Sequence, residues 1–220
     1  NTTSGNAWGM QLVTSQFQTE SGAIVIEGIA GKNSNNARGI AVDGSTFKVF
    51  STSGSISIID KMALNQAGNY NGLYLRPSVS GGIVFGANDA STSTANVSII
   101  SDKIFFDNIS SEIRTSGAVV IESEGDSFQS DFNTSRLFVA PTVSSLRIGK
   151  IDNASDIIAS SAMSIAGPIS IYGGSIDINS DIIATGGNIL LDADTGSGLL
   201  TNLDGINVAD GVAIKTLTSG

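Results

Sequence analysis

Self-similarity is the feature of this sequence that most restricts its fold. Three segments share a short Asn-containing stretch, a glycine and then alternating apolar residues; their glycines, Gly9, Gly39 and Gly72, are almost evenly spaced. A second motif, Ser-Gly followed by alternating apolar residues, comes after each of them. The glycines of these three copies are Gly22, Gly54 and Gly81. The motif recurs at Gly117 and, in a looser form, at Gly187. A strand-built repeat of about 30 residues is typical of a solenoid.

Apolar residues alternate with polar ones, which predicts short strands with one buried face. Residues 23–27, 55–58, 169–171 and 175–178 show this period of two. Ser, Thr, Asn and Gly fill most polar positions, and Ile and Val fill most apolar ones. Because this mixture favours strands and tight turns, we expect an all-β chain with little or no helix.

In the last third of the chain, strand centres recur about every six residues, which fits three strands in a coil of about 20 residues. We expect Ile157, Ile176 and the pair Leu199–Leu200 to stack in one column of such coils. Ile165 and Ile182 are expected to stack in another. The pattern predicts a right-handed parallel β-helix, or β-solenoid, of roughly seven to eleven coils.

No charge block, Pro-rich stretch or break in composition marks a linker. Residues 1–220 are therefore expected to form a single β-solenoid segment that belongs to a longer polypeptide. Within it, residues 1–90 are predicted to form coils of about 30 residues, residues 91–155 less regular coils, and residues 156–220 coils of about 20 residues.

The middle part is rich in Phe. We interpret its rings as fillers of larger coils, with an exposed platform for sugars as the alternative. Its five rings are Phe105, Phe106, Phe128, Phe132 and Phe138.

Composition excludes several classes of function. The chain contains no Cys and no His, so it has no disulfide, no Cys- or His-based zinc site and no Ser-His-Asp relay. Its 20 acidic residues outnumber 11 basic ones, and the net charge of −9 repels nucleic acid and anionic membranes. No apolar run approaches the roughly 20 residues that span a bilayer, so neither a nucleic-acid partner nor a transmembrane segment is expected.

The acidic residues are scattered along the sequence. A polysaccharide-active enzyme needs paired acids, and Asp177 and Asp181 lie on neighbouring coil faces; solvated strand ends are the alternative. Asp192 and Asp194 resemble the start of a calcium loop without its terminal Glu, so they are a weak Ca²⁺ candidate beside a plain turn. We expect no catalytic residue, no cofactor and no enzymatic activity.

Three flat side chains form a candidate contact surface. Trp8 and Tyr70 occupy equivalent positions in two repeats, and Arg38 occupies that position in the repeat between them. If the coils stack, the three side chains form one exposed column that could touch a ligand. Packing at a corner is the alternative interpretation.

Two stretches of the sequence carry a resemblance to a known family. Residues 36–42 with 53–58, and residues 146–150 through 165–174, are similar to the repeats of β-helical surface adhesins of Gram-negative bacteria, of filamentous-haemagglutinin type. Large Bacteroidota surface proteins, including gliding-motility adhesins exported by the type IX route, look similar in repeat style. The family's amino-terminal secretion domain is not evident here. The resemblance implies a secreted, extracellular segment at a bacterial cell surface whose partners are host or surface glycans or proteins.

We therefore expect a non-catalytic structural and adhesive segment of a large surface fibre, acting as a stiff stalk that displays binding regions. One alternative is a self-assembling extracellular filament or sheath subunit, whose partners are neighbouring copies of itself. A second is a polysaccharide-active β-helix enzyme. Filaments formed by the isolated segment would favour the first alternative, and activity lost on mutation of Asp177 or Asp181 would favour the second.

Overall fold

The computed structural model describes most of the chain. The described residues are 7–31, 36–62, 70–77, 82–88, 92–106, 111–193 and 205–217. The regular elements within these ranges are strands, and the strand pairs are parallel. The prediction of an all-β chain with parallel sheets is therefore confirmed. In the same ranges, no helix is long and apolar enough to cross a membrane.

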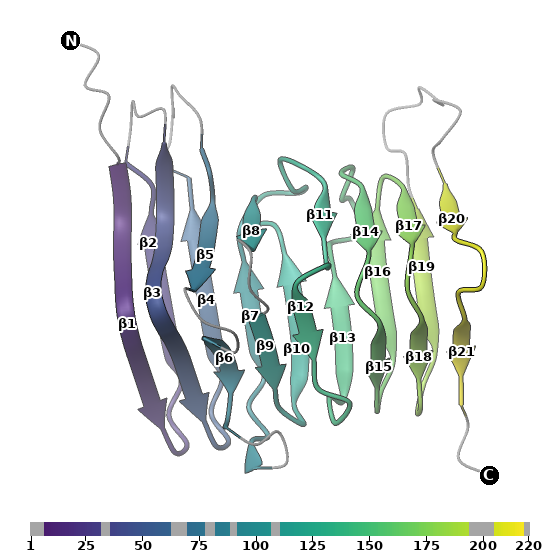
Figure 1. Cartoon of the computed structure of the whole chain (residues 1–220), viewed down its shortest axis with the longest axis horizontal. Helices are drawn as coiled ribbons and strands as arrows, with labels where there is room; N and C mark the ends of the chain where they lie inside the picture. Colours follow the sequence, from purple (N-terminus) through teal and green to yellow (C-terminus); the bar gives the residue numbers. More distant parts are fainter. Residues whose placement is uncertain are drawn as a thin grey trace.

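The strands lie in two layers (Figure 1). In the part of the chain that the structure describes, one seven-stranded sheet forms the layer that lies behind in Figure 1. Its strands, in hydrogen-bonded order, are β2 (Ile24–Ile29), β4 (Ile56–Lys61), β7 (Val97–Ile100), β10 (Ala118–Glu122), β13 (Ser145–Ile148), β16 (Ile169–Gly173) and β19 (Ile189–Ala193).

The front layer of the described residues contains three sheets. The first comprises β1 (Ala7–Thr19), β3 (Ala37–Ser51), β5 (Leu73–Pro77), β6 (Ile83–Gly86), β8 (Ile104–Phe106), β9 (Ser111–Arg114) and β12 (Leu137–Val139). The second sheet comprises β11 (Phe132–Asn133), β14 (Ile157–Ala159), β17 (Ile176–Ile178) and β20 (Ile206–Val208). The third sheet comprises β15 (Met163–Ile165), β18 (Ile182–Ala184) and β21 (Ile214–Thr216). The long strand β3 pairs with β5 along its first part and with β6 along its second, so the front of each later turn is divided into two short strands.

The chain alternates between the two layers. Parallel strands need a crossover between them, and here the crossover is a visit to the opposite layer: β2 pairs with β4 behind, while β3 lies in front. One turn of chain therefore runs through both layers, and it hydrogen-bonds to the turns before and after it.

The register gives the length of each turn. Trp8 pairs with Arg38, and Ile56 pairs with Val97, so these turns take about 30 to 40 residues each. The next turn, from Val97 to its partner Val119, is shorter and takes about 20 residues. Successive strands stay aligned despite this variation because the extra residues lie in the connections, whose length has a small effect on the free energy of folding.

Turns of about 20 residues occur where the sequence indicated them, but not to the end of the chain. Ile157 pairs with Ile176, as expected. The next partner in this column is Ile206, which lies beyond the position that another short turn would reach. The pair Leu199–Leu200, which we expected there, lies outside the described residues.

A second expected column has a different register. Ile182 pairs with Met163, and Ile165 pairs with Ala184. The predicted pairing of Ile165 with Ile182 is wrong because this turn is longer than that pairing requires.

Two aliphatic columns cross the rear sheet and form the base of the core. Inward and outward residues alternate along each strand, so register partners stack on the same face. One column is Ile24, Ile56, Val97, Val119, Leu146, Ile169 and Ile189; the other is Ile26, Ile58, Ile99, Ile121, Ile148, Ile171 and Leu191. Most of their members belong to one core cluster that extends from Ile26 to Ala184, and Ile24, Ile189 and Leu191 are partly buried against it. Burying one such side chain contributes about 1.5–3 kcal/mol.

Aromatic rings fill the core of the longer turns. Phe47 and Phe85 are fully buried and pack edge to face, with ring centroids 5.9 Å apart. In the Phe-rich middle part, Phe128 and Phe132 are buried and stacked at 5.2 Å, and Phe106 packs against the core. The interpretation of the five rings as core fillers is confirmed for these three and wrong for Phe105 and Phe138, which are exposed.

Buried hydroxyl groups line one corner between the layers. Ser93 Oγ donates to the carbonyl of Ser51 at 2.7 Å, and Thr115 Oγ1 donates to the carbonyl of Ala95 at 2.7 Å. The amide of Gly117 in turn donates to Thr115 Oγ1 at 2.9 Å. These side chains give buried backbone groups at the corner the partners that water would otherwise supply.

Candidate functional site

A groove of about 640 Å³ opens on the front layer, where β9 and β12 lie side by side. We call it the β9–β12 groove. Its lining residues are Asn88, Glu112, Ile113, Arg114, Phe138, Val139, Ala140 and Pro141. Glu112 and Phe138 are register partners, whereas their neighbours Ile113 and Leu137 are buried in the core. The period of two therefore turns Glu112, Arg114 and Phe138 outward.

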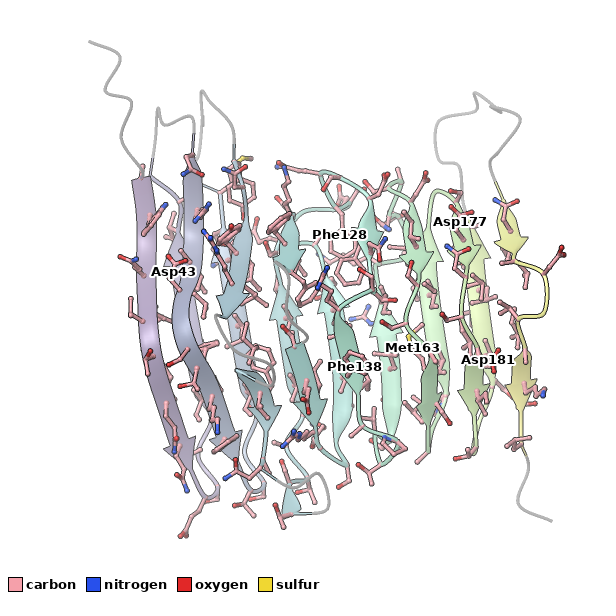
Figure 2. All side chains as sticks on the ribbon, viewed as in Figure 1. Asp43, Phe128, Phe138, Met163, Asp177 and Asp181 are labelled. Carbon is pink, nitrogen blue, oxygen red and sulfur yellow. The ribbon has the colours of Figure 1, made fainter. Side chains whose placement is uncertain are left out.

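An ion pair lies beside an exposed aromatic ring in this groove. Arg114 Nη2 is 2.5 Å from Glu112 Oε2, and Arg114 Nε donates to the same oxygen at 2.7 Å. Arg114 Nη1 donates to the carbonyl of Asn88 at 2.6 Å. The guanidinium is thus held by contacts from three of its nitrogens. Phe138 is 50% exposed, and Figure 2 labels it on the front layer.

The expected column of Trp8, Arg38 and Tyr70 forms only in part. Arg38 pairs with Trp8, and its guanidinium carbon is 5.3 Å from the Trp8 ring centroid. The same carbon lies 3.6 Å from the ring of Tyr74, which stacks on Phe105 with centroids 5.1 Å apart. We call Trp8, Arg38, Tyr74 and Phe105 the aromatic stack.

Tyr70 lies inside the molecule rather than in the exposed column, so this part of the prediction is wrong. Its backbone bridges Ala37, the residue before Arg38, and its side chain is only 6% exposed. An offset of one residue along a strand moves a side chain to the opposite face. Tyr74 lies against Arg38 instead. Gly72, with a φ of 69°, lies between the two tyrosines and interrupts the alternation that would otherwise put both on one face.

Tyr70 belongs to a buried polar cluster around Asp60. Its hydroxyl donates to Asp60 Oδ2, Ser101 Oγ donates to the same oxygen at 2.8 Å, and the Ile40 amide donates to Oδ1 at 2.7 Å. Burial raises the pKa of Asp60 from 3.8 to about 6, although these hydrogen bonds favour the charged carboxylate. Burial, and then the charge of Asp60, raise the pKa of the Tyr70 hydroxyl. The cluster joins turns of the chain and is closed to solvent.

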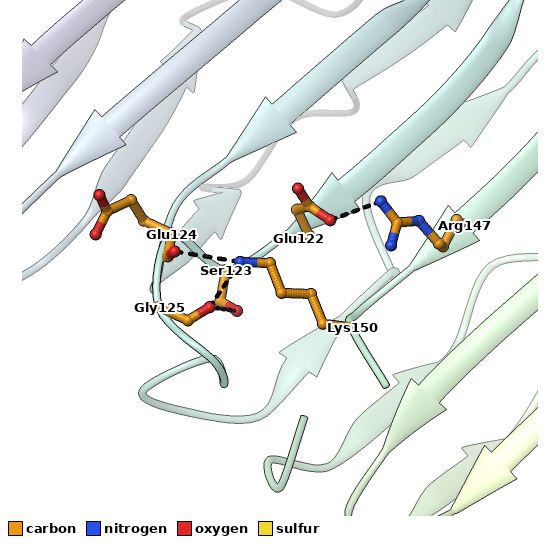
Figure 3. Close-up of polar contacts among 6 residues, drawn as sticks. All are labelled: Glu122, Ser123, Glu124, Gly125, Arg147 and Lys150. Carbon is orange, nitrogen blue, oxygen red and sulfur yellow. Dashed lines mark hydrogen bonds and ion pairs between the residues drawn. The ribbon is translucent and has the colours of Figure 1, made fainter. Parts of the chain in front are cut away.

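Lys150 closes a polar turn after β10 (Figure 3). Its Nζ donates to the carbonyl of Gly125 at 2.8 Å and to the preceding carbonyl at 3.2 Å. The buried Ser123 hydroxyl donates to the same Gly125 carbonyl at 2.8 Å. Arg147 Nη2 binds Glu122 Oε2 at 2.7 Å on the adjacent strands. The basic side chains here hold neighbouring turns together.

The two carboxylates considered as a catalytic pair, Asp177 and Asp181, each have a local partner. Asp177 Oδ1 accepts from Asn207 Nδ2 at 3.0 Å, and Asp181 Oδ1 accepts from the Ala213 amide at 2.8 Å. Figure 2 shows Asp177 near β17 and Asp181 near β18, at different heights of the front layer. The structure thus places them with separate partners from the next turn and does not bring them together as a pair.

The calcium candidate is only half described. Asp192 lies on β19 opposite Tyr172, and Asp194 lies outside the described residues. Among the residues that the structure describes, no group of three or more acidic side chains is arranged to hold a metal ion.

The β9–β12 groove was not predicted from the sequence. The alternation in Ser111–Arg114 places Glu112 and Arg114 on one face, and this signal was available. Their neighbour Phe138 belongs to the following turn of the chain, and only the register of β9 with β12 brings the ring to them.

No family model, curated protein or solved structure matches the chain. The resemblance to haemagglutinin-type adhesins therefore stays a prediction.

Proposed function

We propose that this chain is a segment of a right-handed parallel β-helix that serves as a stiff, non-catalytic stalk in a bacterial surface fibre. The observation that supports the proposal most is the pair of unbroken aliphatic columns across the rear sheet. In this role the segment lies outside the cell and holds binding regions for glycans or proteins away from the surface.

Stiffness follows from the way the turns share their contacts. Each turn hydrogen-bonds to its two neighbours in both layers, so bending the rod strains several backbone ladders at once. Hydroxyl groups at the corner satisfy the backbone where the chain changes layer. The rod thus needs no disulfide to resist local opening, which suits a chain without Cys.

Force spectroscopy tests the mechanical role. The chain is placed between two reference domains and pulled from its ends. A stalk should extend in steps of one or a few turns, each releasing about 20–40 residues, because turns contact only their neighbours. A single all-or-none extension at low force would contradict the proposal.

Surface labelling tests the location independently. Antibodies raised against the purified chain are applied to intact cells of the source bacterium and, as a control, to permeabilised cells. Labelling of intact cells along thin fibres is expected. Labelling that requires permeabilisation would contradict an extracellular stalk.

Exposed apolar side chains favour a second candidate function, the self-assembling filament. Ile206 and Val208 on β20 are 46% and 47% exposed, and Ile214 on β21 is 38% exposed. These strands end their sheets in the described residues, and such edges can template pairing with another chain. Sedimentation of the purified chain and of a variant carrying Ile206→Lys and Ile214→Lys tests this. Filaments of the first and monomers of the second would support assembly.

A further inference from the structure

We propose that the β9–β12 groove binds neutral hexose units of a glycan, with Phe138 as the stacking platform and the Glu112–Arg114 pair as the hydroxyl-binding group. This inference rests on the proposed display role, because it gives the stalk a binding region of its own. Three properties of the groove carry it: an exposed ring, a fixed polar pair and a balanced charge.

The exposed ring is the first property. Phe138 is half exposed, whereas Phe132, on the strand before it, is 2% exposed. The apolar wall continues through Val139, Ala140 and Pro141. The face of an aromatic ring carries negative charge, so it attracts the polarised C–H groups on the apolar face of a pyranose. A ring at the edge of an open groove leaves room for a sugar to stack.

The fixed polar pair is the second property. Neighbouring sugar hydroxyls are each both donor and acceptor, so they match a carboxylate and a guanidinium side by side. Both contacts of Arg114 with Glu112 use Oε2, and among the described residues Oε1 is left to accept from a ligand. The contact of Arg114 with the Asn88 carbonyl holds the pair in place. A pre-ordered pair loses little conformational entropy on binding.

Charge selects the class of sugar, and this is the third property. Glu112 and Arg114 neutralise each other, so the groove offers no net charge to a ligand. The chain as a whole carries −9, which repels sialic and uronic acids. The volume of about 640 Å³ lies within the range of about 300–1,000 Å³ of small-ligand pockets. A short neutral oligosaccharide is therefore the ligand that the groove fits best.

Saturation-transfer NMR with defined sugars tests the inference. The probes are the neutral trisaccharides cellotriose, maltotriose, mannotriose, galactotriose and triacetylchitotriose, with sialyllactose as the anionic comparison. We expect at least one neutral probe to bind the whole chain with a Kd on the order of 1 mM. Binding of none of the neutral probes, or stronger binding of sialyllactose, would overturn the inference.

Two variants locate the binding in the groove. Phe138→Ala removes the platform, and we expect it to weaken the bound neutral probe by about tenfold or more. Glu112→Gln leaves Arg114 without its counter-charge, so neutral binding should fall and sialyllactose binding should rise. Phe105→Ala is the matched control, because it removes a ring of similar exposure outside the groove.

Unchanged binding by Phe138→Ala and Glu112→Gln, with both variants folded by circular dichroism, would overturn the assignment of the groove. If Phe138→Ala does not fold, Glu112→Gln decides the question alone. The pulling and labelling experiments do not depend on this groove. A failure of sugar binding is therefore distinguishable from a failure of the stalk proposal.

Discussion

Asp60 shows how one buried carboxylate makes the stability of the fold depend on pH. It is fully buried and accepts a hydrogen bond from the amide of Ile40 on the neighbouring front strand. Burial raises its pKa to about 6, so the folded chain holds the proton more tightly than the unfolded chain does. The stabilising effect of this proton is complete below pH 3.8 and is lost as the pH rises through about 6.

The prediction for Asp60 concerns the difference between two proteins. Between pH 4 and pH 7, the wild-type chain should lose about 2 kcal/mol of unfolding free energy relative to Asp60→Asn, which has no proton to lose. Urea unfolding at several pH values measures this difference. The exposed Asp152→Asn serves as control and should follow the wild type. A difference between wild type and Asp60→Asn that is constant with pH would contradict the assigned pKa.

The aromatic stack gives a second prediction at this scale. The guanidinium of Arg38 lies between the rings of Trp8 and Tyr74. Arg38→Lys keeps the charge but loses the flat group, so we expect it to lower the unfolding free energy by about 0.5–2 kcal/mol. Thermal unfolding measures this loss, and Arg136→Lys, in a turn outside the aromatic stack, is the control. Equal effects of both substitutions would show that stacking contributes nothing.

At the scale of the element, the Ser-Gly motif has a steric explanation. A Cβ atom at Gly54 would lie 2.0 Å from the carbonyl oxygen of Gly22, and one at Gly117 would lie 2.3 Å from that of Ala95. Both glycines sit where a strand of the rear layer begins, against the backbone of the preceding turn. At these two positions the turn approaches its neighbour without a side chain in between.

The glycine explanation predicts the effect of a single methyl group. Gly117→Ala should lower the unfolding free energy by about 1–3 kcal/mol, because the backbone has to shift to admit the Cβ. Gly125→Ala is the control: its nearest neighbour would be 3.6 Å away, which is ordinary contact. Chemical unfolding of both variants gives the comparison. Equal stability of the two would contradict the steric explanation.

The aliphatic columns predict that truncating an inward residue and an outward residue of the same strand will have different effects on stability. Ile121 is fully buried in a column, and its neighbour Val120 points outward on β10. Ile121→Ala should cost about 2–5 kcal/mol through lost burial and the cavity left behind. Val120→Ala should cost much less, because its side chain leaves no internal void. Denaturant titration of both variants distinguishes them, and a cost at Val120 as large as at Ile121 would argue against the assigned faces.

At the scale of the whole molecule, stability is expected to vary along the stack. The central turns have two neighbours each and a fully buried core, whereas all three residues of β20 and of β21 are exposed. In a stack with nearest-neighbour contacts, the end turns open first. Hydrogen exchange followed by mass spectrometry should give the fastest exchange in β20 and β21 and the slowest in β7, β10 and β13. Uniform exchange along the chain would contradict this gradient.

The sequence by itself determined the strands and their inward faces, because these depend on side-chain alternation. The sequence also predicted two of the contacts across turns, Ile157 with Ile176 and Trp8 with Arg38, but the tertiary structure decided the others. Turn length varies about twofold along the chain, and an offset of a single position reverses the face that a side chain occupies. Tyr70 is buried where it pairs with Ala37, whereas Tyr74, beyond Gly72, stacks on Arg38. Phe138 meets Glu112 only through the register of β12 with β9, in a groove that no local pattern predicts.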